Sequence, residues 1–177
     1  DLKYRLASNV ILDATVNPDF GQVELDPAVI NLTAFETRFS ERRAFFVEGA
    51  GIFNFSEGGP MGSVGRPPQL AYSRRIGRSP RGRVPSAAVF SQVPNATTIL
   101  GAAKVTGQVG NGWSLGILEA VTAKEMGSYT TTDGGAHDIL VEPAANNFIM
   151  RLRRQVEGGA TRFGVMGTAL NRDLSGT

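Results

Sequence analysis

The stretch TTILGAAKVTGQVGNGWSLGILEAVTA, residues 97–123, decides the fold. It contains two runs of alternating apolar and polar residues, joined by a Gly-Asn-Gly turn. A period of two places successive side chains on opposite faces of a β-strand. Val105 and Leu115 then share an apolar face, whereas Lys104 and Ser114 share a polar face. The stretch therefore predicts an antiparallel hairpin with one apolar and one water-facing side.

The same pattern recurs in NNFIMRLRRQVEGGATRFGVMGTALN, residues 146–171. Met150 and Leu152 share one face of the first run, and Arg151 and Arg153 share the other. Glycines again separate the two runs. We therefore expect a second hairpin, with a polar face that is rich in arginine.

Residues 2–17 predict a further hairpin with shorter strands. A three-residue turn would place Leu6 opposite Leu12 and Tyr4 opposite Ala14, so that apolar side chains face each other. With the two longer hairpins, this segment makes the chain predominantly β.

The longest alternating runs, 98–108, 113–123 and 147–157, each hold about 11 residues. Strands of soluble proteins usually have about 5–6 residues, whereas a tilted strand needs about 9–11 to cross a bilayer. An apolar face toward lipid and a basic face toward water are typical of a membrane barrel. The fold class that we predict is all-β, an antiparallel up-and-down membrane β-barrel segment. The alternative is a soluble sandwich or lipocalin-like barrel with its apolar face inward.

Residues 18–69 interrupt this pattern. Asp26 followed by Pro27 is typical of a helix start, and we expect a short helix to about Arg38. The interruption is too long for a simple hairpin connection. We therefore predict one β-barrel domain over residues 1–177, with 18–69 inserted as a partly helical plug or lid.

The remaining connections give weaker signals. We expect a strand at 70–76, a loop at 77–96 and a short strand at 139–141. Glu119 falls on the apolar face by parity; either a bulge near Leu118 turns it inward, or it lies at the membrane interface.

Composition excludes several classes of protein. The 177 residues contain no cysteine, so zinc–thiolate sites, redox dithiols and disulfides are ruled out. The net charge of +2 is too small to indicate nucleic-acid binding. Proline and glycine interrupt the densest group of arginines, which predicts a solvated loop; its members are Arg74, Arg75, Arg78 and Arg81.

Five blocks of sequence carry a family resemblance: DATVNPDFGQVE (13–24), DPAVINLTAFE (26–36), ERRAFFVEG (41–49), YSRRIG (72–77) and NRDL (171–174). They resemble an uncharacterised bacterial outer-membrane β-barrel family, a domain of unknown function that follows a carbohydrate-binding, family-nine-like domain. The resemblance implies that this chain is the early part of the barrel, with the sandwich upstream and more strands downstream. It also implies a location in the bacterial outer membrane. It supplies no catalytic residues.

The polar faces of the predicted strands carry the main candidate site. Charged rings select solutes in pores, so a charged inner face would favour anionic or sugar solutes. The alternative is that these charges pair with the plug. The candidate lumen-lining residues are Lys3, Arg5, Asp13, Lys104, Arg151, Arg153 and Arg162.

A weaker candidate is a calcium site at Asp19, Glu24 and Asp26, since calcium takes several oxygen ligands. The alternative is a turn in which Asp19 bonds its own backbone and Asp26 caps the helix. We predict no other cofactor.

Two further groups of residues are candidates for catalysis. Glu36, Glu41 and Glu48 are candidates for paired carboxylates of a glycoside hydrolase, and ion pairing with nearby arginines is the alternative. His137 is the only histidine, and no Gly-x-Ser-x-Gly sequence accompanies it. It is therefore a poor candidate for a catalytic triad.

These observations predict an outer-membrane β-barrel segment that binds or passes a carbohydrate or another small solute. Its expected partners are outer-membrane lipid and that solute, without nucleic acid. The alternatives are an envelope hydrolase that acts on glycans and a structural scaffold for a partner protein. The sequence leaves open whether the chain is an enzyme.

Overall fold

The protein is all-β with few helical turns. The computed structural model describes residues 1–18, 38–54, 70–156, 158 and 161–175. Six strands form one antiparallel sheet in the order β1-β2-β4-β5-β8-β9, and three form a smaller sheet in the order β3-β6-β7. The large sheet contains β1 (Leu2–Ala7), β2 (Val10–Val16), β4 (Ile99–Val109), β5 (Trp113–Thr122), β8 (Ala145–Val156) and β9 (Thr161–Arg172). The small sheet contains β3 (Phe90–Gln92), β6 (Glu125–Thr130) and β7 (Ala136–Glu142).

The described helical segments are short, and they are α1 (Ala44–Val47), η1 (Ala50–Phe53) and η2 (Ser73–Arg75). No described helix is long and apolar enough to cross a membrane.

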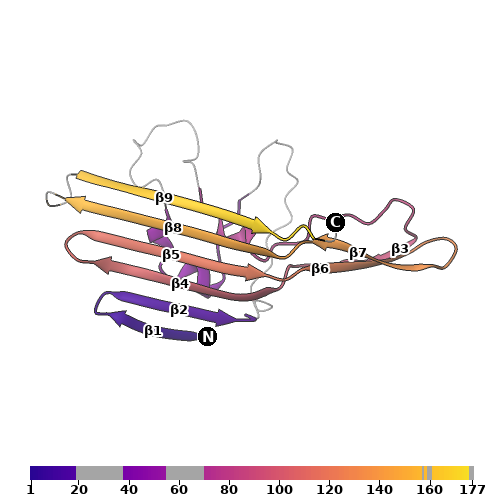
Figure 1. Cartoon of the computed structure of the whole chain (residues 1–177), viewed down its shortest axis with the longest axis horizontal. Helices are drawn as coiled ribbons and strands as arrows, with labels where there is room; N and C mark the ends of the chain where they lie inside the picture. The colour runs from indigo at the N-terminus through magenta and orange to yellow at the C-terminus, as the bar shows by residue number, and fades with distance from the viewer. Residues whose placement is uncertain (19–37, 55–69, 157, 159–160, 176–177) are drawn as a thin grey trace.

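The six strands lie side by side in a single layer, with the tight turns at one end (Figure 1). The β6–β7 hairpin, with β3, extends from the opposite end of this layer. Over the described residues the large sheet stays open, because β1 and β9 each pair with one neighbour. The antiparallel all-β prediction is confirmed, whereas closure into a barrel stays a prediction.

The two long hairpins are confirmed. β4 pairs with β5 from Ile99 to Val109, and β8 pairs with β9 along the full length of both strands. The first hairpin forms with a different register from the expected one. Tyr4 lies opposite Leu12, because Ala7 pairs with Val10 across a two-residue turn. The register shifts by one residue between Arg5 and Ala7, so that Arg5 pairs with Ile11 and Ala7 with Val10.

Two local predictions are wrong, and so is one of the two alternatives for Glu119, the bulge near Leu118. Residues 70–76 contain the 3-10 turn η2, which tertiary hydrogen bonds from Arg43 hold in place. Residues 77–96 include the short strand β3, which pairs with β6. Glu119 stays on the apolar face, where it accepts a hydrogen bond from Asn146, because the β4–β5 register is regular around Leu118.

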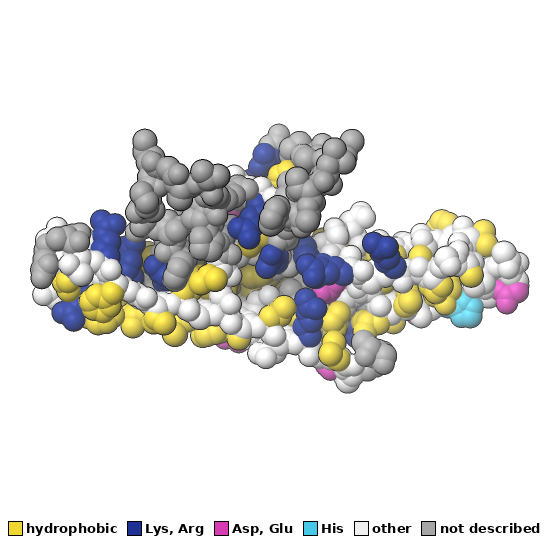
Figure 2. Space-filling model, turned by 90° about the horizontal axis from the view of Figure 1, so that it is seen from above, with side chains coloured by type: hydrophobic (Ala, Val, Ile, Leu, Met, Phe, Trp, Pro, Cys, Tyr) yellow, Lys and Arg dark blue, Asp and Glu magenta, His cyan; other side chains and the backbone are white. Residues whose placement is uncertain are grey.

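The two faces of the large sheet differ in what lies against them. One face, here called the covered face, packs against the segments 38–54 and 70–78. The core forms in this interface, from Phe46 and Ile76 above the sheet and from sheet residues that include Ile99, Ala102, Leu118, Ala120 and Ile149. The opposite face, here called the open face, has no described segment against it. Figure 2 shows basic side chains gathered on the side that carries the covering segments, and hydrophobic side chains along the opposite side.

Candidate functional site

The strand register places all seven candidate lumen-lining residues on the covered face. Lys3, Asp13 and Lys104 form one row across three neighbouring strands. Arg5 and Arg151 belong to the next row. Arg153 and Arg162 continue the same face toward the tight turns, opposite Ser114 and Gln155 respectively. The alternation in the sequence therefore identified one face correctly, and the role of its charges stays a prediction.

Lys104 is the most deeply buried of these charges, with 1% of its surface exposed. Its Nζ donates hydrogen bonds to the main-chain oxygens of Phe45 and Glu48, at 2.5 and 2.6 Å. The same ammonium group lies 3.7 Å from Oδ2 of Asp13 and 4.8 Å from the centre of the Phe45 ring. A buried charge must be paired and hydrogen-bonded, and these contacts supply both conditions. Lys104 therefore fixes α1 and its flanks onto the sheet.

A second ion pair fixes the start of this covering segment. Arg43 donates to both carboxylate oxygens of Glu41, at 2.8 and 2.7 Å, and to the main-chain oxygens of Ser73 and Ile76. Burial by itself opposes ionisation of Glu41, but hydrogen bonds from Arg43 and Ser73 outweigh it and hold its pKa at about 2. The two covering segments are thus joined through one guanidinium group.

The carboxylates proposed for glycoside hydrolysis have structural partners where they are described. Glu41 pairs with Arg43, and Glu48 pairs with Lys3, which lowers the pKa of Glu48. Glu36 lies outside the described residues. His137 stacks on Tyr129 in the β6–β7 hairpin, with ring centres 5.2 Å apart. Glu41 therefore pairs with an arginine, as the alternative expects, whereas Glu48 pairs with a lysine of β1.

The candidate calcium ligands Asp19, Glu24 and Asp26, with the expected helix after Asp26, lie outside the described residues. The described part of the chain contains no group of three or more His, Cys, Asp or Glu side chains placed to hold a metal ion. Calcium binding at 19–26 stays a prediction.

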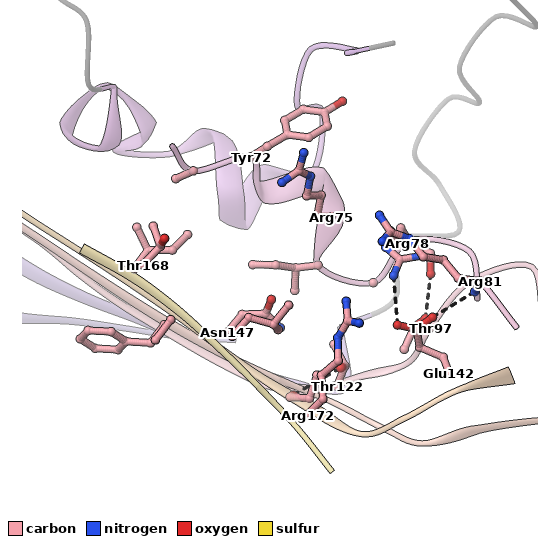
Figure 3. A pocket seen from close by; sticks show the side chains of 18 of the residues that line it. Tyr72, Arg75, Arg78, Arg81, Thr97, Thr122, Glu142, Asn147, Thr168 and Arg172 are labelled. Carbon is pink, nitrogen blue, oxygen red and sulfur yellow. Dashed lines mark hydrogen bonds and ion pairs between the residues drawn. The ribbon is translucent and has the colours of Figure 1, made fainter. Parts of the chain in front are cut away.

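A cavity of about 320 Å³ lies beside η2, above the end of the sheet where β8 begins and β9 ends (Figure 3). Its lining includes four arginines, Arg75, Arg78, Arg81 and Arg172. The sequence predicts a solvated loop for three of them, and strand alternation puts Arg172 on the polar face of the last strand; neither pattern indicates that the four lie around one cavity. The signal available in the sequence was the density of arginine between residues 74 and 83.

Glu142 organises one side of this cavity. Its Oε1 accepts a hydrogen bond from Nη2 of Arg78 at 3.0 Å, and its Oε2 accepts one from the main-chain N–H of Arg81 at 3.0 Å. The N–H of Gly82 bonds the main-chain oxygen of Val141 at 2.7 Å. The loop that carries Arg78 and Arg81 is therefore fixed against β7.

The fold and this geometry define an all-β protein whose main sheet has one charged, covered face and one apolar, open face. A family model described as a domain of unknown function, DUF5916, matches residues 1–162. The chain therefore belongs to this uncharacterised family. Searches among the curated proteins and among the solved structures each found no match.

Proposed function

We propose that the six-stranded sheet is part of the wall of an outer-membrane β-barrel, with the covered face toward the interior. The barrel binds or passes a small solute, and segment 38–54 lies in the interior or at one mouth. Carbohydrate is the solute class that the family resemblance implies. A fold alone does not fix a function, so the support must come from the two faces.

The observation that carries the proposal is the apolar character of the open face. Rows of aligned apolar side chains run across it, such as Tyr4, Leu12, Val105, Ile117 and Met150. At its margins Tyr4 is 60% exposed and Val165 is 57% exposed. Soluble monomers rarely expose contiguous apolar patches larger than about 300–600 Å². Lipid would cover such a face without any further protein element.

Four of the six strands of the large sheet also have suitable lengths. β4, β5, β8 and β9 contain 11, 10, 12 and 12 residues. About 9–11 residues are needed for a tilted strand to cross the hydrocarbon core. These four strands therefore match the thickness of a bilayer, whereas β1 and β2 are shorter, with six and seven residues.

Aromatic and basic groups meet near the tight-turn end of the open face. The rings of Trp113 and Phe163 pack edge to face with centres 6.0 Å apart, and the guanidinium of Arg154 lies 5.3 Å from the Trp113 ring. Trp is enriched where membrane meets water, and Arg can extend its charge into that region. This cluster fits one boundary of a membrane-spanning band.

A paired substitution on β9 tests the orientation. Val165→Arg places a charge on the open face, whereas Thr168→Arg places the same charge on the covered face. An arginine that faces lipid costs about 2–4 kcal/mol near the bilayer midplane, so the proposal expects Val165→Arg to reduce membrane assembly strongly. Thr168→Arg should assemble normally. The measurement is heat-modifiable gel migration of the full-length protein in the membrane fraction.

Wild-type protein in the soluble fraction would refute the proposal, as would equal assembly of the two variants. For passage of solutes, conductance in planar bilayers should change with Arg153→Glu, because this charge lies on the covered face. The control is Arg83→Glu, an exposed residue outside the sheet. An unchanged conductance and ion selectivity in Arg153→Glu would contradict passage along this face.

A further inference from the structure

The cavity beside η2 collects side chains from three parts of the chain that are distant in sequence. Arg81 comes from the loop after η2, Asn147 from β8, and Arg172 from the last position of β9. Figure 3 shows Arg78 and Arg81 on one side of the cavity, with Asn147 and Thr168 on the sheet that forms its floor. Arg172 rises from the same sheet toward the loop that carries Arg78 and Arg81, here called the arginine loop. The volume of about 320 Å³ is at the lower end of the range of about 300–1,000 Å³ for small-molecule sites.

The charges around this cavity are unbalanced. Four arginines and one glutamate are among the lining residues. Glu142 already accepts from Arg78 and from the main chain of Arg81, so its carboxylate is engaged at one side. Within the described part of the chain, the guanidinium groups of Arg81 and Arg172 form no hydrogen bond or ion pair. The guanidinium groups of Arg81 and Arg172 therefore line the same cavity and can both donate hydrogen bonds to a ligand.

Guanidinium groups bind oxyanions through two parallel hydrogen bonds, which gives geometric selectivity as well as attraction. Asn147 and Thr168 add neutral hydrogen-bonding groups on the floor of the cavity. Such a lining suits a ligand that carries hydroxyl groups as well as an anionic group. Buried apolar ligands would leave these polar groups unsatisfied.

We propose that this cavity binds a small hydroxylated organic anion, held by its carboxylate or phosphate group between Arg81 and Arg172. The proposal deepens the proposed function and rests on it for the origin of the ligand, which would be the solute that the barrel binds or passes. Recognition itself depends only on the described cavity.

Exposed arginines are commonly solvated without a ligand, so the test must separate recognition from general positive charge. Purified full-length protein is titrated calorimetrically at low ionic strength with galacturonate, glucose 6-phosphate and glucose. We expect saturable binding of at least one of the two anions and no binding of glucose. Comparison of the two anions distinguishes a carboxylate site from a phosphate site.

The informative variants are Arg81→Gln and Arg172→Gln, each expected to weaken anion binding about tenfold. The matched control is Arg83→Gln, which removes the same charge from an exposed residue that does not line the cavity. Arg81 and Arg172 are both exposed, so their replacement should leave the fold intact. Unchanged thermal unfolding of the two variants checks this.

Three results would overturn the inference: no binding of either anion, equal binding of glucose, or equal weakening by Arg83→Gln and Arg81→Gln. The outcome is independent of membrane location. Anion binding by a protein found in the soluble fraction would refute the barrel and retain the site. Membrane assembly without anion binding would refute the anion site and retain the barrel.

Discussion

Lys104 and Asp13 lie directly opposite each other in the β2–β4 register, and their charged groups approach to 3.7 Å beneath α1. Asp13 is 8% exposed and Lys104 is 1% exposed, so this pair is removed from water on the covered face. The lysine also bonds two main-chain oxygens of the covering segment. One cation therefore links two strands and the segment that covers them.

Lys104→Met should detach the covering segment. The change removes two hydrogen bonds and leaves the Asp13 carboxylate buried without its nearest partner. Removing one partner of a buried pair costs about 3–5 kcal/mol, so we expect a clear fall in the unfolding midpoint. Tryptic cleavage after Arg42 or Arg43 should also become faster. Lys124→Met, at an exposed position, is the control and should leave both readouts unchanged.

Glu41→Gln should weaken the junction between the two covering segments by about 2 kcal/mol at neutral pH, since Arg43 loses its charged acceptor. The pKa of Glu41 in the folded protein is about 2, against an ordinary value of 4.5. Its stabilising contribution is therefore complete above about pH 4.5 and is lost as the pH falls toward 2. Denaturant unfolding between pH 7 and pH 2 measures this.

The control for Glu41 is Asp138→Asn, at an exposed position on β7. The difference in stability between wild type and Glu41→Gln should shrink across the acidic range. A difference that stays constant from pH 7 to pH 2 would show that the ionised carboxylate of Glu41 is not the source of the effect.

Gly116→Val should lift η1 from the sheet. A Cβ atom at Gly116 would lie 2.3 Å from Cγ2 of Ile52 and 3.0 Å from the Phe53 ring. Overpacking of this kind costs about 1–3 kcal/mol. Hydrogen exchange of residues 50–53 should accelerate. Gly167→Val is the matched control, because a Cβ atom there meets nothing within 4 Å; equal acceleration in both variants would exclude the steric explanation.

Glu142→Gln should loosen the arginine loop without removing its main-chain tether to β7. The amide can still accept from the N–H of Arg81, but the charged pair with Arg78 is lost. We expect a cost of about 1–2 kcal/mol, seen as faster hydrogen exchange at Arg81 and Gly82. Glu119→Gln, which alters an exposed carboxylate on the open face, should leave those amides unaffected.

The hairpins could be predicted because their alternation persists over ten or more residues. Only an extended strand keeps alternating residues, such as Lys104 and Val105, on opposite faces throughout a run of that length. β3 and β6 escaped prediction because three residues, or six with an internal glycine, are too few to establish a period. η2 depends on Arg43, thirty residues earlier, so local sequence does not encode it.

The same argument applies to the sites. The charged face follows from strand parity, and each of its candidate residues is therefore visible in the sequence. The cavity depends on the loop of Arg81 and the end of β9 at Arg172 lining the same space, which only the complete topology creates. The charged face could therefore be predicted from the sequence, whereas the cavity beside η2 could not.

The strand order has a consequence for how the chain assembles. β1–β2, β4–β5 and β8–β9 are each joined by a few residues, whereas residues 17–98 separate β2 from β4 and residues 123–144 separate β5 from β8. Closing a longer loop costs more chain entropy, by about 0.6 kcal/mol for each doubling. The three local pairs are therefore the natural first products of folding. The large sheet then grows as these two-strand hairpins pair with one another, β2 with β4 and β5 with β8. The two long connections complete their own packing after these pairings have formed.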